Sequence, residues 1–242
     1  ETNPQFANAL RRIMMVEIPN MAVETVDFSS NNSSLYDETI AHRLAMIPIL
    51  FDQKKYNLKD ECKCEGKGCS LCEIVFVVNK KGPGIVYSKD MKSSDPEAKP
   101  FYDNIPIVEL ADDESIKFEA VASLGTGRDH AKFNTAIAFH RYYPTIEVSG
   151  LKNADECVKS CPRNALDIKG NTASVKMKCD LCQECVRTAN PQGSIKIFGD
   201  KTKFIIDVES ISALTAEQIV MSAVEILKDR AHDLEKEIKK LK

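Results

Sequence analysis

The sequence lacks two features that define broad classes of protein: a long apolar run and an excess of positive charge. No stretch approaches the roughly 20 apolar residues of a helical membrane span, and no charged-then-apolar leader opens the chain. Its 33 basic residues are outnumbered by 36 acidic ones, a formal net charge of -3. Without a general positive field, any role with nucleic acid has to be local or indirect. We therefore expect a cytoplasmic protein with no membrane contact.

Catalytic signatures are also scarce. The four histidines are scattered over different segments, and none lies in a Ser/His/Asp or Cys/His pattern. The glycine pair in 124–128 (LGTGR) is not followed by the Lys-Ser/Thr of a phosphate loop, and no GxGxxG opens a helix. No acidic motif stands out that would hold the metal ions of phosphodiester formation. We expect no active site in this chain.

What the chain does have is an ordinary globular composition, 43% hydrophobic and 29% charged over 242 residues. Such a length can form one large core or two to three small ones. Helical spacing after the Asn3-Pro4 start predicts a first helix that Pro19 ends, and a second helix is expected over 37–45. The stretch 82–106 is interpreted as long loops. Strand patterns occupy 21–28, 73–78, 116–122 and 203–208.

The final segment has the most regular pattern. Thr215 and Gln218 have the spacing of a capping box. A helix of about 27 residues would span roughly 40 Å, more than a small domain needs. A narrow stripe favours pairing with another helix, and packing on its own sheet is the close alternative. The stripe alternates gaps of four and three and consists of Val220, Val224, Leu227, Ala231, Leu234, Ile238 and Leu241.

All nine cysteines fall into two groups. In a reducing compartment, metal ligands are favoured over disulfides. Gly66 and Gly68 permit a tight turn within the first group. Four sulfurs with no open position favour one structural Zn²⁺, with a second iron–sulfur cluster as the alternative. This group packs four thiols into eleven residues: Cys62, Cys64, Cys69 and Cys72.

The second group contains a 28-residue repeat of a ferredoxin-type run, C-x2-C-x2-C-x3-C. In two-cluster ferredoxins, the fourth cysteine of one run binds the cluster of the other. With this exchange, one set of four ligand positions is incomplete because it contains a single cysteine. Its members are Leu151, Ala154, Cys157 and Ala189. The complete set is Cys161, Cys179, Cys182 and Cys185.

This swapped set predicts one [4Fe–4S] cluster, or its [3Fe–4S] form, and leaves Cys157 as a free thiol. Pro162 follows Cys161 as in such runs, and the two halves continue into similar apolar stretches, 165–168 and 194–197. Zinc on the same thiolates and a purely structural or disulfide use are the alternatives.

Three longer segments resemble the alpha-like subunits of cellular RNA polymerases: NPQFANALRRIMMVEIPNMAVETVDF, NNSSLYDETIAHRLAMIPI and GTGRDHAKFNTAIAF. The ferredoxin-like insertion before the closing strand and helix is similar to that of archaeal D-type members. The resemblance implies an α+β fold with a discontinuous dimerisation domain, residues 1–50 and 201–242. It further implies a β-rich second domain over 51–148, with the zinc loop at 62–72, and a ferredoxin-like domain over 149–200.

The resemblance implies an assembly scaffold, with the iron–sulfur cluster structural or regulatory. The partners would be the smaller alpha-like subunit, called L, and then the subunits N, P and B, of which N and P are small zinc proteins and B is large. DNA would be met only through the complex. The pairing surface would combine the C-terminal stripe with Phe6, Leu10, Ile13 and Met14. Segments 33–48 and 124–133 would contact the other subunits, with interface cations at Arg11, Arg12, Arg43 and Arg128.

A different class of function is an electron-transfer protein or redox-enzyme subunit built on the ferredoxin-like insertion. It would be favoured by two clusters in series, a flavin or nicotinamide fingerprint, or a reactive cysteine. With one complete cluster set and no such fingerprint, the scaffold interpretation is strongly favoured.

Overall fold

The computed structural model describes residues 2–170 and 172–241. The chain divides into two compact units, each built from two separate stretches of sequence. The larger unit combines Arg12–Ala138 with the chain from Val208 onward, and the smaller unit combines the chain up to Arg11 with Phe139–Asp207. Among the described residues, no helix is both long and apolar enough to cross a membrane.

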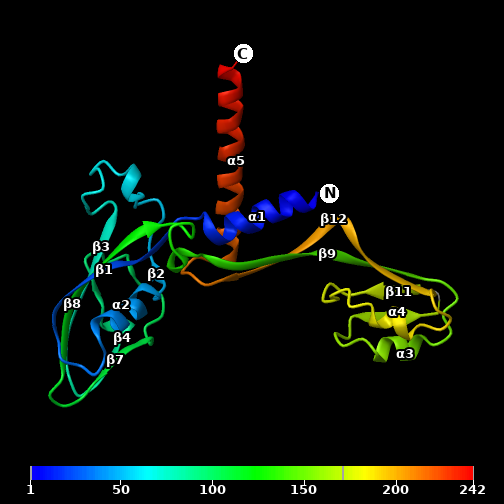
Figure 1. Cartoon of the computed structure of the whole chain (residues 1–242), viewed down its shortest axis with the longest axis horizontal. Coiled ribbons are helices and arrows are strands. Elements are labelled where there is room, and N and C mark those ends of the chain that lie inside the picture. The colour runs from blue at the N-terminus through cyan, green and yellow to red at the C-terminus, as the bar shows by residue number, and fades with distance from the viewer. Residues whose placement is uncertain (1, 171, 242) are drawn as a thin grey trace. The chain divides into compact units, whose positions relative to one another are not determined.

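The larger unit is organised around an antiparallel sheet of order β1-β8-β3-β5 (Figure 1). Phe28 and Phe118 face each other across β1 and β8, with ring centroids 5.5 Å apart. The predicted strands at 21–28, 73–78 and 116–122 are confirmed, each longer than expected. Their bounds are β1 (Asn20–Asn31), β3 (Glu73–Lys81), β5 (Lys92–Ser93) and β8 (Ser115–Gly125).

The core of this unit forms where helix α2 (Asp37–Ala45) packs with β1 and the smaller strands. Strand β8 alternates buried and exposed side chains because one face of the pleat meets the core. Helix α2 has the bounds that the sequence predicts, and its Ile40 and Leu44 are fully buried.

The loop interpretation of 82–106 is wrong in part. Short pairs form there: β2 (Ile49–Leu50) with β6 (Lys99–Pro100), and β4 (Gly84–Tyr87) with β7 (Pro106–Leu110). Val86 and Ile107 are fully buried within them. These strands depend on long-range pairing and core burial, which the local composition of polar residues and prolines does not reveal.

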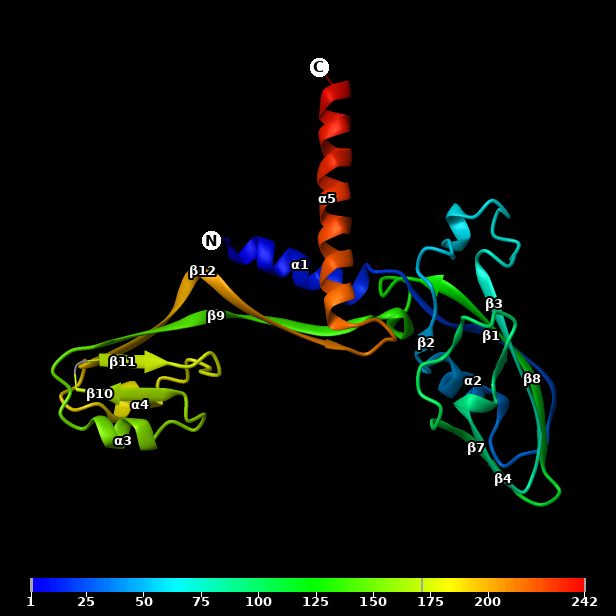
Figure 2. The same ribbon diagram turned by 180° about the vertical axis from the view of Figure 1, so that it is seen from behind.

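The smaller unit contains the second cysteine group (Figure 2). A hairpin of β10 (Leu166–Lys169) and β11 (Thr172–Val175) lies beside α3 (Ala154–Lys159) and α4 (Glu184–Thr188). Strands β9 (Ala136–Val148) and β12 (Ile195–Ser210) pair with each other. The strand predicted at 203–208 is thus part of a much longer one. The core comprises Cys157, Ala165, Leu166, Ile168, Cys179, Cys185, Ala189, Ile195 and Ile197.

Two longer helices complete the chain, α1 (Pro4–Val16) and α5 (Ala216–Lys240). The first begins after Asn3, whose Oδ1 accepts a 2.9 Å hydrogen bond from the Phe6 amide. The capping box of α5 is confirmed: the Thr215 hydroxyl accepts from the Gln218 amide, and the Gln218 side chain accepts from the Thr215 amide. From residue 228 to 240 every described residue of α5 is exposed, and its last turns extend beyond the rest of its unit (Figures 1 and 2).

A buried carboxylate connects α5 to the chain that follows α1. The Glu17 side chain is 7% exposed and forms ion pairs with Arg128 and Arg230. Arg230 lies on α5, and Arg128 lies in the loop after β8. A buried carboxylate is costly without charged partners. The two ion pairs of Glu17 therefore stabilise the position of α5 at Arg230 within its unit.

Candidate metal centres and interaction helix

The first cysteine group converges on a single point. The Sγ atoms of Cys62 and Cys69 lie 3.5 Å apart, and Cys69 and Cys72 3.7 Å apart. Cys64 approaches Cys72 to 3.6 Å. Among the described residues, these four form the only set of three or more His, Cys, Asp or Glu ligand atoms that all lie within 4.8 Å of one another. The predicted cluster is confirmed as a site that can hold a metal ion.

Backbone geometry brings these sulfurs together. Gly66 and Gly68 both have positive φ, +78° and +88°, as expected for a turn that needs glycine. A Cβ on Gly68 would lie 2.2 Å from the Glu73 carboxylate. That carboxylate forms a 2.8 Å ion pair with Lys59, which connects the segment before the cysteines to the start of β3. The Lys59–Glu73 ion pair therefore joins the segments on either side of the cysteine loop.

The acidity of these thiols is uneven. Burial raises the pKa of Cys72 to about 12. Desolvation acts in the same direction on Cys64, but hydrogen bonds from Cys62 and Cys72 outweigh it and lower its pKa to about 7. The Cys64 thiol is thus ready to ionise near neutral pH, while the Cys72 thiol needs a cation to replace its proton.

A charged cluster lines a cavity together with part of the same loop. Lys55 Nζ lies 2.5 Å from Asp95 Oδ2, and the Tyr56 hydroxyl donates to the same oxygen. Hydrogen bonds from Lys55, then from Tyr56 and the Glu97 amide, lower the pKa of Asp95 to about 2. Sequence reasoning missed this cluster because Asp95 lies 39 residues from Tyr56 and carries no local signal.

Replacing Asp95 with asparagine is expected to destabilise the protein in a pH-dependent way. The folded-state pKa lies below the ordinary value of about 4, so the carboxylate stabilises fully above about pH 4 and loses its contribution as pH falls toward 2. Urea unfolding at several pH values should show a gap between wild type and Asp95→Asn that narrows over this window. Asp112→Asn, in an exposed turn, is the control, and a pH-independent gap would contradict the assignment.

The second cysteine group lines a small cavity, whereas the sulfurs of the first group lie close to one another. The four sulfur-bearing residues predicted to be cluster ligands all line one small cavity, beside Arg163 and Asp180. The Arg163 guanidinium forms a 3.2 Å ion pair with the Asp180 carboxylate. Cys182 is exposed and Cys161 is half-buried. These four are Cys161, Cys179, Cys182 and Cys185.

The backbone around this cavity is arranged to stabilise thiolates. The Ala165 amide donates to Cys161 Sγ at 3.3 Å, and the Leu181 amide donates to Cys179 Sγ at 3.4 Å. Leu181 and Gln183 have positive φ, +60° and +66°, an uncommon geometry for residues other than glycine. Such strain clusters at functional sites, and here it accompanies the turn that contains Cys182.

Burial acts strongly on the innermost cysteine of this group. Desolvation, then the negative charges of Cys179 and Cys161, raise the pKa of Cys185 to about 11. Clustered thiolates repel one another in a site with little water. A cationic centre would reverse this, because it favours the deprotonated form of every sulfur around it.

The incomplete half of the repeat is filled with apolar side chains. Cys157 is fully buried, and its thiol donates to Asn153 Oδ1 at 3.7 Å. The same oxygen accepts from the Asn190 amide at 2.8 Å, so Asn153 joins the two halves. Cys157 and Ala189 are core members, and Leu151 and Ala154 pack against them. Cys157 is absent from the described lining of the cavity.

The predicted stripe on α5 lies mostly on an open surface. Leu234 is 62% exposed, Ile238 49% and Leu241 88%, and Val224 and Ala231 are exposed too. Val220 and Leu227 are half-buried. Exposed apolar side chains in a continuous row are uncommon on an isolated chain and indicate an interaction surface.

The apolar residues of α1 are placed differently. Phe6 is exposed, but Leu10, Ile13 and Met14 are buried within the chain itself. Met14 is also held through its carbonyl, which accepts a 2.6 Å hydrogen bond from the Thr135 hydroxyl. Only Phe6 among these four offers open apolar surface.

The four arginines expected at interfaces have contacts within the chain or lie at its surface. Arg43 donates to the Ile107 carbonyl at 2.8 Å, and Arg128 pairs with Glu17. Arg11 bonds the Asn8 side chain on α1. Arg12 is exposed. Arg43 and Arg128 thus each have an intrachain role besides any interface role.

Comparison with known proteins places the chain in the class of alpha-like RNA polymerase subunits. Residues 21–142 match the family model of the RNA polymerase Rpb3/RpoA insert domain. DNA-directed RNA polymerase subunit Rpo3 of Archaeoglobus fulgidus is 39% identical over 241 residues, covering 99% of this chain and 91% of that protein. The Methanosphaera stadtmanae subunit of the same name is 38% identical over 240 residues, covering 95% and 88%. The chain belongs to the Rpo3 family of archaeal DNA-directed RNA polymerase subunits.

Proposed function

We propose that the chain is a non-catalytic assembly subunit of an archaeal DNA-dependent RNA polymerase in the cytoplasm. It pairs with the smaller subunit L, and the pair then recruits subunits N, P and B. DNA is met only through the complex. Family membership supports the role in RNA polymerase. The exposed apolar stripe on α5 is the observation that supports pairing with L.

The exposed α5 stripe and, separately, Phe6 are the proposed pairing contacts. A second helix can cover the stripe because its residues keep the alternating three and four spacing of a helical seam. Leu10, Ile13 and Met14 contribute indirectly, since their side chains are buried within the chain. Segments 33–48 and 124–133, with Arg11, Arg12, Arg43 and Arg128, are proposed contacts for the remaining subunits.

The first cysteine group is proposed to hold one structural Zn²⁺. Tetrahedral coordination with Zn–S bonds of about 2.3 Å separates neighbouring sulfurs by about 3.8 Å. The observed separations of 3.5, 3.6 and 3.7 Å fit one ion. A zinc ion with four thiolates has no open position, so its contribution is to hold the loop in shape.

The second cysteine group is proposed to hold one [4Fe–4S] cluster, or its [3Fe–4S] form. In a cubane each thiolate binds a different iron, so the sulfurs stand further apart than around one ion. This agrees with a cavity between them and with a spacing wider than that of the first group. Its role is mainly structural, because Cys179 and Cys185 are themselves members of the small core.

Metal analysis of the chain co-expressed with L and purified without oxygen tests this proposal. We expect about four iron, a similar amount of acid-labile sulfide and about one zinc per chain. Cys64→Ser should abolish the zinc and leave the iron unchanged, because the two sites share no ligand.

Two outcomes would contradict the metal assignments. About eight iron per chain would place a cluster in the first group and favour an electron-transfer function. Loss of iron together with zinc in Cys64→Ser would show that the two sites are not independent. Failure of the chain to co-purify with L would contradict the scaffold proposal itself.

A further inference from the structure

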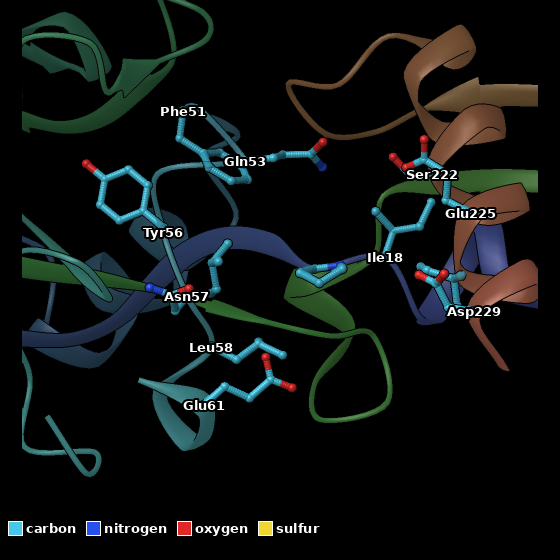
Figure 3. A pocket seen from close by; sticks show the side chains of 13 residues that line it. Ile18, Phe51, Gln53, Tyr56, Asn57, Leu58, Glu61, Ser222, Glu225 and Asp229 are labelled. Atoms are coloured by element: carbon cyan, nitrogen blue, oxygen red, sulfur yellow. The ribbon is translucent and has the colours of Figure 1, made fainter. Parts of the chain in front are cut away.

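A groove of about 290 Å³ lies in the larger unit, between α5 and the segment that follows β2 (Figure 3). Its floor is apolar and includes Ile18, Phe51 and Leu124. Leu58 and Ile226 add apolar surface from the two sides. The groove therefore offers an apolar binding surface at its centre rather than a polar one.

The rim of the groove carries charge of one sign. Glu61 lies on one side, and Glu225 and Asp229 lie on the other, on α5 (Figure 3). Among the described lining residues there is no lysine or arginine. Because both walls are acidic, the groove attracts cationic groups and disfavours anionic ones.

The groove uses a different face of α5 from the exposed stripe. Ser222, Glu225, Ile226 and Asp229 recur at helical spacing and form one face. Val224, Ala231 and the rest of the stripe lie on about the opposite side, given 3.6 residues per turn. One helix can thus contact a pairing partner and a second segment at the same time.

We infer that this groove binds a basic peptide segment with an apolar anchor residue, supplied by another polymerase subunit. The anchor side chain occupies the floor beside Phe51 and Ile18. Lysine or arginine side chains flanking it pair with Glu61 on one wall and with Glu225 and Asp229 on the other. The inference rests on the proposed membership in a polymerase complex, and not on which partner covers the stripe.

The size of the groove favours a peptide over a small-molecule ligand. Sites for such ligands usually enclose roughly 300–1,000 Å³ and surround most of the ligand. This groove is at the lower limit and has an exposed acidic rim, since Glu61, Glu225 and Asp229 are all exposed. An exposed rim around an apolar centre is the usual arrangement of a protein interface.

Site-specific crosslinking in the purified polymerase tests the inference. A photoreactive benzoylphenylalanine replaces Gln53, whose side chain points across the groove toward α5 (Figure 3). We expect an adduct with one segment of another subunit, identified by mass spectrometry as rich in lysine or arginine. Glu225→Lys with Asp229→Lys should reduce adduct yield about tenfold, because like charges then face each other.

A charge-matched control separates a local effect from a general one. Asp112→Lys with Asp113→Lys makes the same change in net charge within an exposed turn outside the groove and should leave the yield unchanged. If the double lysine variant fails to assemble, Glu225→Gln with Asp229→Asn removes the charge without reversing it and should lower the yield less.

Several results would overturn the inference. They are an adduct on a neutral or acidic segment, an adduct only within this chain or with a second copy of it, the absence of any adduct, or a yield insensitive to the groove charges. Co-purification with the other subunits is scored in the same preparation. A complex that forms without the expected adduct refutes the groove alone, whereas a chain that joins no complex refutes the proposed function as well.

Discussion

Replacing Cys182 with serine is expected to remove the iron–sulfur cluster and to loosen the smaller unit. Iron should fall from about four per chain to below about one, because a [4Fe–4S] cubane binds four thiolates and the variant retains three. Hydrogen exchange over 151–199 should accelerate strongly, because the cluster contributes much of the packing in a core of about nine buried residues. The larger unit has its own extensive core and should keep its protection.

Cys157→Ala is the matched control for this variant. Its thiol is buried and bonds Asn153, outside the described cavity lining, so the variant should retain about four iron per chain. Pairing with L should survive in Cys182→Ser because α5 belongs to the larger unit. Loss of iron in Cys157→Ala would refute the swapped ligand set, and loss of L binding in soluble Cys182→Ser would refute independent folding of the two units.

Replacing Leu234 with glutamate is expected to weaken pairing with L about 100-fold. The substitution puts a charge into the centre of the proposed helix seam, where association would bury it without a partner. Leu234 is 62% exposed in the unpaired chain, so the free energy of unfolding of that chain should change by less than about 0.5 kcal/mol. Titration calorimetry with purified L, beside thermal unfolding of the unpaired chain, measures both quantities.

Lys236→Glu provides the control on the same helix. Lys236 lies on the side of α5 away from the stripe and forms a surface ion pair with Asp233. Its replacement should leave the affinity for L within about threefold. Unaltered pairing in Leu234→Glu would mean that L covers another surface, and equal losses in both variants would mean that the effect is general electrostatics.

The candidate sites were predicted from the sequence to different degrees. The first cysteine group was predicted correctly as a cluster because its four ligands lie within one short loop, where glycines allow the turn. The 28-residue repeat indicated which of the remaining cysteines to group, and the structure brings those four around one cavity. Nothing in the local pattern indicated Asp95 or Glu17, whose partners lie far along the chain.

By itself, the sequence determined the elements that depend on short-range order: the capping box and stripe of α5, the bounds of α2, and the grouping of the cysteines. Helical periodicity and ligand spacing are properties of neighbouring residues, so they can be recognised without the fold. The tertiary structure alone decided which apolar residues remain open, that 82–106 contains paired strands, and that Glu17 joins Arg128 across 111 residues. These depend on contacts between distant segments, whose formation reflects the packing of the whole core rather than any local pattern.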